Sequence, residues 1–390
     1  MVGAFSLSVR LIGILRSGTP PPAWAASPDR KASPARRCGA RVLVTLLWSG
    51  FAPGRVPESD ERCYGSRRRG RPEGVAMTGR IGVLGAGGVG SAYAAHLARA
   101  GADVVLVGRG SAHVQALAAG PLQVDPPGSD PWKVDVPVAA RTTDVAPGSL
   151  DVLLLLTKSY DLGEAAASAA HVLAPDGVAV PLQNGLGTDA LVADVFGEER
   201  TLVGTTTVGA ALAEPGRITV SVSTAAGGSR TDLGRMGRGR APLERGADVA
   251  AALQAAGLGA EAVPQVDTLI WNKLALASMS PLSSVPRVTV ATVWNSPEGR
   301  DLAERMVSEV VAVAHAEGVE LDRDAALDHA RAVWAGTGEH YTSMCTDVRN
   351  GRRTELSGMA AAVARLAGAH GVPVPVHTTV LGLLALAGVR

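Results

Sequence analysis

One stretch of sequence, residues 80–110, constrains the fold of this chain more than any other. It reads RIGVLGAGGVGSAYAAHLARAGADVVLVGRG. A short apolar run leads into three glycines, Gly85, Gly87 and Gly90, at G-x-G-x-x-G spacing. A helical pattern and a second apolar run follow. Strand, glycine turn, helix and strand in this order predict a βαβ unit that binds a dinucleotide.

Each glycine of the motif has its own physical reason. Gly85 permits a tight turn, Gly87 allows a pyrophosphate to approach the backbone, and Gly90 allows the helix to pack closely on the strand. The phosphates would lie at the helix N-terminus, where backbone N–H groups and the helix dipole favour an anion. The cofactor-binding residues expected in this turn are Gly85, Ala86, Gly87, Gly88, Val89 and Gly90.

The end of the second apolar run indicates which cofactor is bound. A site for NAD usually has Asp or Glu there, which accepts from the ribose 2′-OH. This chain instead has Gly108, Arg109 and Gly110, with no acid. The guanidinium of Arg109 suits a 2′-phosphate, so we predict NADP(H). The alternative is a solvated arginine in a loop.

Length, charge and cysteine content narrow the class of protein. The 390 residues are enough for about two domains. The net charge of +1 gives no reason to expect a nucleic-acid or membrane partner. The three cysteines have no metal-ligand or redox spacing, and the histidines form no metal-binding pattern. A reducing compartment is the default for such a chain, so we expect a cytoplasmic protein without a metal.

The first part of the chain differs from the rest. Residues 1–76 are rich in Pro, Arg, Ser and Gly, and their apolar runs are too short to span a bilayer. We expect a disordered leader there. Met77 immediately precedes the dinucleotide unit, so the simplest hypothesis is that translation starts at that residue.

The pattern downstream predicts two domains. Strand-like and helix-like segments alternate through 77–264, whereas 265–390 reads as helices only. The expected fold class is α/β, with an N-terminal Rossmann-type dinucleotide-binding domain followed by an all-helical C-terminal domain. Residues 227–240, rich in Gly and Arg, read as a loop, and 354–367 as a helix.

Two polar residues follow buried strands of the first domain. Lys158 comes after an apolar run that begins at Asp151, and Asn184 follows another. Ligands in open α/β sheets lie at the carboxyl ends of strands, so both residues are candidates for cofactor contact. A surface lysine and an ordinary Asn-Gly turn are the alternatives.

The helical half contains candidates for the chemistry. Lys273 stands alone in an apolar helix, either on its solvent face or in a cleft where it could give a proton to an alkoxide. Glu355 would lie in the first turn of the 354–367 helix, where glutamates are common for dipole reasons. Ser343 is a hydroxyl donor in a loop or at a helix start, and the alternative, which the sequence alone favours, is a helix cap.

Several stretches together resemble the ketopantoate reductase (2-dehydropantoate 2-reductase) family. Besides the glycine unit they are LLLLTKSYD, VPLQNGLG, LVGTTTVGA, TLIWNKLALA and SMCTDVRNGRRTEL, and they cover the chain from about Gly79 to its end. The resemblance implies an NADPH-binding Rossmann domain, a helical C-terminal domain and reduction of 2-dehydropantoate to (R)-pantoate in pantothenate biosynthesis.

The resemblance also implies roles for single residues. Lys273 matches the family's proton donor. Asn184 matches an asparagine that contacts the cofactor and the substrate carbonyl, and Ser343 a serine that holds the substrate. Cofactor contacts are implied for Lys158, Ala210 and Glu355.

The chain departs from the family after Lys273. The family usually has two asparagines that help to bind the hydroxyl end of the substrate, and here Ala277 and Ser280 stand in that stretch, which is one residue shorter. A reductase of another 2-oxo acid is therefore an alternative, and so is an NADP-binding sensor without turnover. The partner expected is a small 2-oxo acid, and a homodimer is possible.

Overall fold

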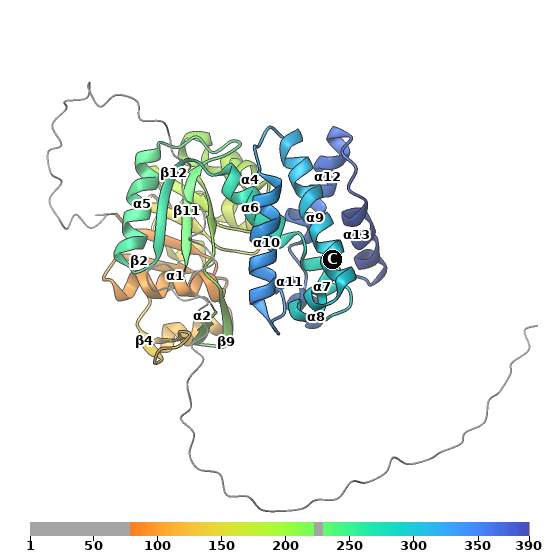
Figure 1. Ribbon diagram of the computed structural model, residues 1–390. Helices are drawn as coiled ribbons and strands as arrows, with labels where there is room; N and C mark the ends of the chain where they lie inside the picture. The colour runs from red at the N-terminus through yellow and green to blue at the C-terminus, as the bar shows by residue number, and fades with distance from the viewer. Residues whose placement is uncertain (1–78, 222–228, 390) are drawn as a thin grey trace, which may run out of the picture. The chain divides into compact units, whose positions relative to one another are not determined.

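The computed structural model describes residues 79–221 and 229–389, so the leader expected over 1–76 lies outside it. Figure 1 shows strands and helices alternating in the first half of the described chain, followed by helices up to the C-terminus. This is the α/β arrangement, with a parallel sheet first and a helical region second, that the sequence predicted. The prediction of the fold class is therefore confirmed.

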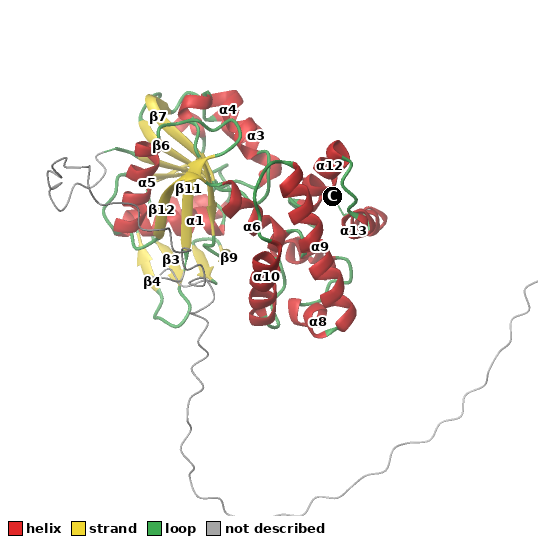
Figure 2. Ribbon diagram, turned by 45° about the horizontal axis from the view of Figure 1, so that its top comes forward, coloured by secondary structure: helices red, strands yellow, loops and turns green. Residues whose placement is uncertain are grey.

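A five-stranded parallel sheet is at the centre of the N-terminal region (Figure 2). Its ladders pair Ile81 with Val104 on one side and with Val152 on the other. These strands are buried on both faces, which is why they read as continuous Val and Leu runs rather than as alternating patterns. In spatial order the strands are β5 (Val138–Ala139), β2 (Val104–Val107), β1 (Ile81–Leu84), β6 (Leu150–Leu155) and β7 (Leu173–Pro181).

The strand order reverses beside β1, because β2 lies on one side of it and β6 on the other. Ligands of open α/β sheets bind at such a switch point, beyond the carboxyl ends of the strands. The glycine turn follows β1 and leads into helix α1 (Gly88–Arg99). The remaining helices of this region are α2 (Ala112–Ala119), α3 (Leu162–Ser168), α4 (Thr188–Phe196) and α5 (Leu243–Ala255), with short 3₁₀ turns η1 (Thr142–Asp144), η2 (Ser159–Asp161) and η3 (Glu198–Arg200).

Two smaller sheets complete the N-terminal region. One has the order β4 (Trp132–Val134), β3 (Leu122–Asp125), β10 (Arg217–Val220) and β9 (Ala210–Glu214). The other has the order β12 (Gly259–Gln265), β11 (Arg230–Arg235) and β8 (Val203–Thr206). Helix α5 runs beside β11 and β12, as Figure 1 shows.

The central strand of the last sheet corrects one prediction. Residues 227–240 were expected to form a loop, but β11 lies within them and pairs with β8 and β12. Its inward side chains Thr231 and Leu233 are fully buried, while Arg230 contacts the carboxylates of Asp232 and Glu261 at 2.6 and 2.5 Å. Pairing on both sides outweighs a composition that is typical of loops.

The C-terminal region consists of helices around a second apolar core that contains Trp271, Met306 and Val363. Several helices begin at side chains that cap them. Ser296 and Asp322 each accept a hydrogen bond from the N–H three residues on, at 3.0 and 2.8 Å. The helices are α6 (Asp267–Ala277), α7 (Ser280–Ser284), α8 (Val290–Asn295), α9 (Pro297–Ala316), α10 (Arg323–Thr337), α11 (Ser343–Arg349), α12 (Ala360–His370) and α13 (Pro375–Leu386), with the 3₁₀ turn η4 (Leu356–Gly358) before α12.

Within 79–221 and 229–389, no helix has the length and apolar character needed to cross a membrane. The same residues contain no cluster of His, Cys, Asp and Glu side chains suited to hold a metal ion.

Candidate active site

The glycine turn between β1 and α1 leaves no room for side chains at Gly85 and Gly90. Gly85 has φ of +122°, and a Cβ there would lie 2.6 Å from the carbonyl carbon of Leu156. A Cβ on Gly90 would overlap the carbonyl oxygen of Gly85. These two glycines therefore allow the turn to form and the helix to pack closely on it.

Gly87 is different, because a Cβ placed there would meet no atom within 4 Å. It is the N-cap of α1, no side chain caps the helix, and the first helical turn has no acidic residue. The open space therefore lies at a helix N-terminus that has N–H groups available for an anion. This cradle fits the pyrophosphate of a dinucleotide.

Other residues of the turn bring neighbouring segments close. A Cβ on Gly88 would lie 2.5 Å from the carbonyl oxygen of Ala210, so the start of β9 lies against the start of α1. A Cβ on Gly108, which follows β2, would lie 3.2 Å from the Cβ of Ala86, and Val89 packs against the apolar core. The structure thus brings Ala210 and the end of β2 to the turn, as a common cofactor site requires.

Arg109 follows β2, and its side chain is 82% exposed. Its guanidinium forms an ion pair of 3.0 Å with Asp161, the residue that precedes α3. An exposed guanidinium is accessible to a phosphate, but here a carboxylate already contacts it. Asp161 was not among the residues that the sequence pattern indicated.

Lys158 lies between two carboxylates from the helical region. Its Nζ donates to Asp347 at 2.9 Å and to Glu355 at 3.1 Å, and the backbone N–H of Ser159 donates to the other oxygen of Glu355 at 2.9 Å. Burial alone would lower the pKa of Lys158, but the charges of Glu355 and Asp347 outweigh it and raise that pKa. The contacts join the segment after β6 to α11, which contains Asp347, and to the segment between α11 and α12, which contains Glu355.

The prediction that Glu355 lies in the first turn of a helix is wrong. It precedes the 3₁₀ turn η4, and α12 begins only at Ala360. The chain is diverted here because the carboxylate of Glu355 contacts Lys158 and Ser159, while the carbonyl oxygen of Gly358 accepts from the N–H of Leu186 at 2.9 Å. Those contacts replace the bonds that a continuous helix would make.

Lys273 lies on α6, and its half-buried side chain points at the N-terminal region. Its Nζ donates to the carbonyl oxygen of Thr206 in β8, at 2.5 Å. Burial lowers the pKa of Lys273 from 10.5 to about 8, against a smaller opposing effect of the Glu355 carboxylate. A lysine whose pKa is close to neutral can exchange a proton with a reacting group.

Asn184 follows β7 and is half-buried. The turn that contains it is held by the bond between Leu186 and Gly358, three residues after Glu355. The structure therefore brings Asn184, Lys158 and Glu355, which are far apart in the sequence, to one neighbourhood.

Ser343 is the first residue of α11 and is exposed. The cap of this helix is Thr342, which accepts from the N–H of Cys345 at 3.1 Å, so a capping role for Ser343 is wrong. Ser343 lies one turn before the buried Asp347 on the same helix. Asp347 was not among the residues predicted from the sequence, and the signal that could have indicated it was an acid on the buried side of a short helix.

Several buried polar atoms near the strand ends have no partner in the described part of the chain. They are the hydroxyl oxygens of Thr157 and Ser159 and the side-chain oxygen of Gln183. Thr157 lies beside Gly85, because a Cβ on that glycine would be 2.7 Å from the Thr157 nitrogen. Buried polar groups normally have hydrogen-bond partners. A polar ligand at the glycine turn would provide them.

Comparisons with known proteins agree with this geometry. A family model described as ketopantoate reductase PanE/ApbA matches residues 81–237, and one described as its C-terminal part matches residues 265–387. The 2-dehydropantoate 2-reductase of Halobacterium salinarum is 34% identical over 310 residues, which are 79% of this chain and 98% of that protein.

Solved structures have the same fold. The PanE/ApbA family ketopantoate reductase from Ralstonia eutropha JMP134 is 27% identical, with a TM-score of 0.70 over 79% of this chain and 97% of that one. A dimeric ketopantoate reductase from Staphylococcus aureus is 19% identical, with a TM-score of 0.66 over 79% and 98% of the two chains, and shows likeness of fold alone.

Proposed function

The chain belongs to the ketopantoate reductase family, and on this premise we propose that it reduces 2-dehydropantoate to (R)-pantoate with NADPH. The observation that carries the proposal is the contact of Lys273 with the N-terminal region. A lysine with a lowered pKa reaches β8 from the helical region, near the carboxylate that contacts Lys158. A non-catalytic sensor would have no use for such a lysine.

The proposed cofactor is NADPH, bound by residues of both regions. The glycine turn would hold the pyrophosphate, and Arg109 the 2′-phosphate. When bound, NADPH supplies the hydride that reduces the C2 carbonyl. The remaining cofactor-binding residues proposed are Ala86, Gly88, Val89, Lys158, Asn184, Ala210 and Glu355.

Lys273 is the proposed proton donor. Reduction of the carbonyl leaves an alkoxide, which needs a proton from a positioned acid. The Thr206 carbonyl holds the Nζ of Lys273 by a hydrogen bond, and a pKa of about 8 keeps most of the amine protonated at pH 7. Lys273 therefore combines a fixed position with a proton that is readily lost.

Asn184, Lys273 and Ser343 are the proposed substrate contacts. The amide of Asn184 can donate to the substrate carbonyl, and the exposed hydroxyl of Ser343 to its carboxylate or hydroxyl. The substrate proposed is a small 2-oxo acid. We further propose that residues 77–264 form the NADP-binding domain, with Glu355 contributed by the other region, and that 265–390 form the helical domain that binds the substrate and supplies the proton donor.

Another 2-oxo acid is the second candidate substrate, and the end of α6 favours it. Ala277 replaces an amide expected from the resemblance, and the next helix contains buried serines instead. The hydroxyls of Ser283 and Ser284 donate to the carbonyl oxygen of Ser280 at 3.1 and 2.8 Å, so they are occupied within the helix. This side of the site has fewer polar groups for the substrate.

The decisive experiment compares a panel of 2-oxo acids, each with NADPH and with NADH. We expect the highest kcat/KM for ketopantoate with NADPH. A higher value for another acid would select the second candidate, and no oxidation of NADPH with any acid would refute a reductase. Lys273→Ala should reduce kcat by about 100-fold or more, the contribution typical of a general acid, and leave NADPH binding nearly unchanged.

Two further proposals concern the assembly and the compartment. We propose a homodimer, as in the relative from Staphylococcus aureus, which light scattering of the purified protein would test. We also propose a cytoplasmic location, which is the default for a chain whose cysteines have no disulfide-like spacing.

A further inference from the structure

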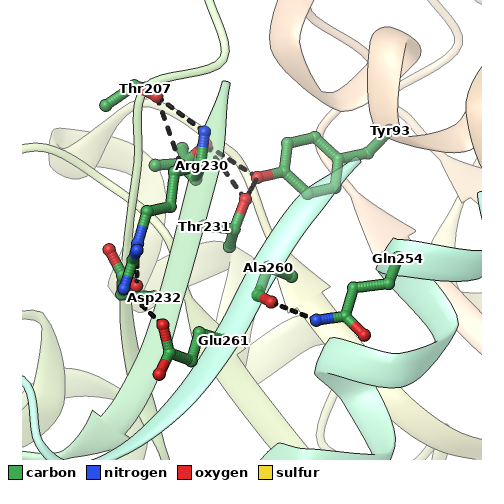
Figure 3. Close-up of polar contacts among 9 residues, drawn as sticks. Tyr93, Thr207, Arg230, Thr231, Asp232, Gln254, Ala260 and Glu261 are labelled. Atoms are coloured by element: carbon green, nitrogen blue, oxygen red, sulfur yellow. Dashed lines mark hydrogen bonds and ion pairs between the residues drawn. The ribbon is translucent and has the colours of Figure 1, made fainter. Parts of the chain in front are cut away.

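Three hydroxyl groups meet inside the N-terminal region. The phenol oxygen of Tyr93 on α1 lies 2.8 Å from the hydroxyl of Thr206 and 2.5 Å from that of Thr231. The two threonine hydroxyls are 3.3 Å apart. Figure 3 shows the ring of Tyr93 pointing its oxygen at Thr231 on β11. We call these three residues the hydroxyl cluster.

The hydroxyl cluster is buried. Tyr93 and Thr231 have no exposed surface, and burial raises the pKa of Tyr93 to about 12, so its phenol keeps its proton. Thr206 also accepts from the N–H of Val208 at 3.1 Å. A phenylalanine would bury the same ring without a polar atom to satisfy, so packing alone gives no reason for a tyrosine.

Thr206 connects the hydroxyl cluster to the proposed proton donor. Its side chain belongs to the cluster, and its carbonyl oxygen accepts from the Nζ of Lys273 at 2.5 Å. We propose that Tyr93, together with Thr231, is a positioning residue that fixes the Thr206 carbonyl and through it the Nζ of Lys273. This inference rests on the proposed reductase activity.

Helix α1 gives the arrangement a further consequence. The N-terminus of α1 forms the cradle at Gly87, and Tyr93 lies in the same helix. One rigid helix therefore sets the position of the proposed cofactor site and, through the hydroxyl cluster, that of Lys273. The hydride and the proton must reach the same substrate carbonyl. A single helix that positions both the cofactor and Lys273 therefore keeps the two donors correctly placed relative to each other.

The first test removes one oxygen atom. In Tyr93→Phe the ring still fills its space, but the Thr206 hydroxyl loses a partner and the carbonyl of Thr206 is held less firmly. With NADPH prebound and saturating 2-oxo acid, we expect the single-turnover rate to fall about 10-fold, since small misplacements of a catalytic group reduce rates strongly. The dissociation constant of NADPH should not change, and the solvent deuterium isotope effect should rise as proton transfer becomes slower.

A matched control comes from the same sheet. The amide nitrogen of Gln254 on α5 donates to the carbonyl oxygen of Ala260 on β12 at 2.6 Å, as Figure 3 shows. Gln254→Leu removes a hydrogen bond of this sheet without touching the hydroxyl cluster. Its rate and isotope effect should equal those of the unaltered enzyme. Thr231→Val removes the other partner of Tyr93 and replaces Tyr93→Phe if that variant does not fold.

A second readout does not depend on turnover. The chain has four lysines, Lys31, Lys133, Lys158 and Lys273, so a protein labelled with ¹³Cε-lysine gives few NMR signals to assign. We expect Lys273 to titrate near its pKa of about 8 in the unaltered protein. In Tyr93→Phe its pKa should rise toward 10.5, because a less restrained Nζ reaches water, while the nearby Glu355 carboxylate is unchanged.

The two readouts separate this inference from the proposed function. If none of the 2-oxo acids supports oxidation of NADPH by the unaltered enzyme, the proposed function is refuted. The titration of Lys273 then decides the inference alone. An active enzyme whose Tyr93→Phe variant keeps the same single-turnover rate and the same Lys273 titration overturns the inference. A lower rate in Tyr93→Phe with an equal loss in Gln254→Leu also overturns it, because the effect is then a general one on the sheet.

Discussion

The guanidinium of Arg109 lies 3.0 Å from the carboxylate of Asp161, so the arginine proposed to bind the 2′-phosphate already has an anionic partner. The side chain of Arg109 is 82% exposed and that of Asp161 only 23%. Asp161 ends the 3₁₀ turn η2 and directly precedes the first residue of α3. A 2′-phosphate must therefore compete with Asp161 for the same guanidinium.

This competition predicts the effect of Asp161→Asn. Without the carboxylate, the KM for NADPH should fall about 2- to 5-fold, since an exposed ion pair contributes less than about 1 kcal/mol. The KM for NADH should change little, because NADH has no 2′-phosphate. Steady-state kinetics with both cofactors measures the ratio of the KM for NADPH to the KM for NADH. Asp328→Asn is the control, because it removes the carboxylate of another exposed pair, with Arg331 on α10. An unchanged ratio in Asp161→Asn would remove Arg109 from the cofactor site.

The lowered pKa of Lys273 predicts opposite pH profiles for the two directions of the reaction. Reduction needs the protonated amine, so its rate should fall as the pH rises through about 8. Oxidation of the hydroxy acid needs the neutral amine, so its rate should rise over the same interval. Initial rates from pH 6 to pH 10 in both directions, about four units around that pKa, check the prediction. Profiles that bend in the same direction would exclude Lys273 as the group responsible.

A buried carboxylate predicts how acid affects stability. Glu309 on α9 accepts from the N–H groups of Val376 and His377 and from the ring of His377, at 2.9, 3.0 and 2.6 Å. Burial would raise the pKa of Glu309, but these hydrogen bonds outweigh it and lower that pKa below 4.5. The carboxylate therefore stabilises the fold above pH 4.5, and this contribution is lost as the pH falls through the lowered pKa.

Glu309→Gln tests this role. It should reduce the free energy of unfolding at pH 7 by about 2 kcal/mol, as expected for loss of charged hydrogen bonds to buried donors. Its stability should also fall less steeply below pH 5 than that of the unaltered protein. Urea unfolding at several pH values measures both. Glu304 lies on the same helix and forms an exposed ion pair with Arg331. Glu304→Gln should therefore change little in either the free energy of unfolding at pH 7 or its dependence on pH below 5.

Local patterns predicted most of the fold. The glycine spacing from Gly85 to Gly90 and the buried Val and Leu runs depend on neighbouring residues, so the first βαβ unit could be derived from the sequence. Strand β11 could not, because Arg230 and Asp232 form a strand only when β8 and β12 lie beside them. Pairing with distant strands leaves little trace in a short, polar segment.

The candidate site was predictable to a similar extent. Lys158 and Asn184 stand where strands end, and position in the pattern was enough to single them out. Asp161 gave no such signal, and Asp347 gave only that of an acid on the buried side of a short helix. Each becomes significant through a partner far along the chain, Arg109 for Asp161 and Lys158 for Asp347. The Thr206 carbonyl belongs to the backbone, which every residue has, so the residue type at this position could not indicate its contact with Lys273.

The last prediction compares Gly87 and Gly90, two glycines at the N-terminus of α1 whose surroundings differ. Gly87 has φ of −90° and open space around its missing side chain, so Gly87→Ala should fold with an unchanged melting temperature. The added methyl group would occupy the cradle, and the dissociation constant of NADPH should rise about 10-fold or more, because the pyrophosphate could no longer approach the backbone. Isothermal titration with NADPH and thermal unfolding measure the two quantities separately.

Gly90→Ala should behave in the opposite way. Its methyl group would overlap the carbonyl oxygen of Gly85, so β1 and α1 would have to move apart, and the free energy of unfolding should fall by about 1–3 kcal/mol. Gly120→Ala, with extended backbone and no atom within 4 Å of an added Cβ, controls for the substitution itself. If Gly87→Ala binds NADPH as tightly as the unaltered protein, the pyrophosphate does not lie in this cradle, because an anion there would contact the new methyl group directly.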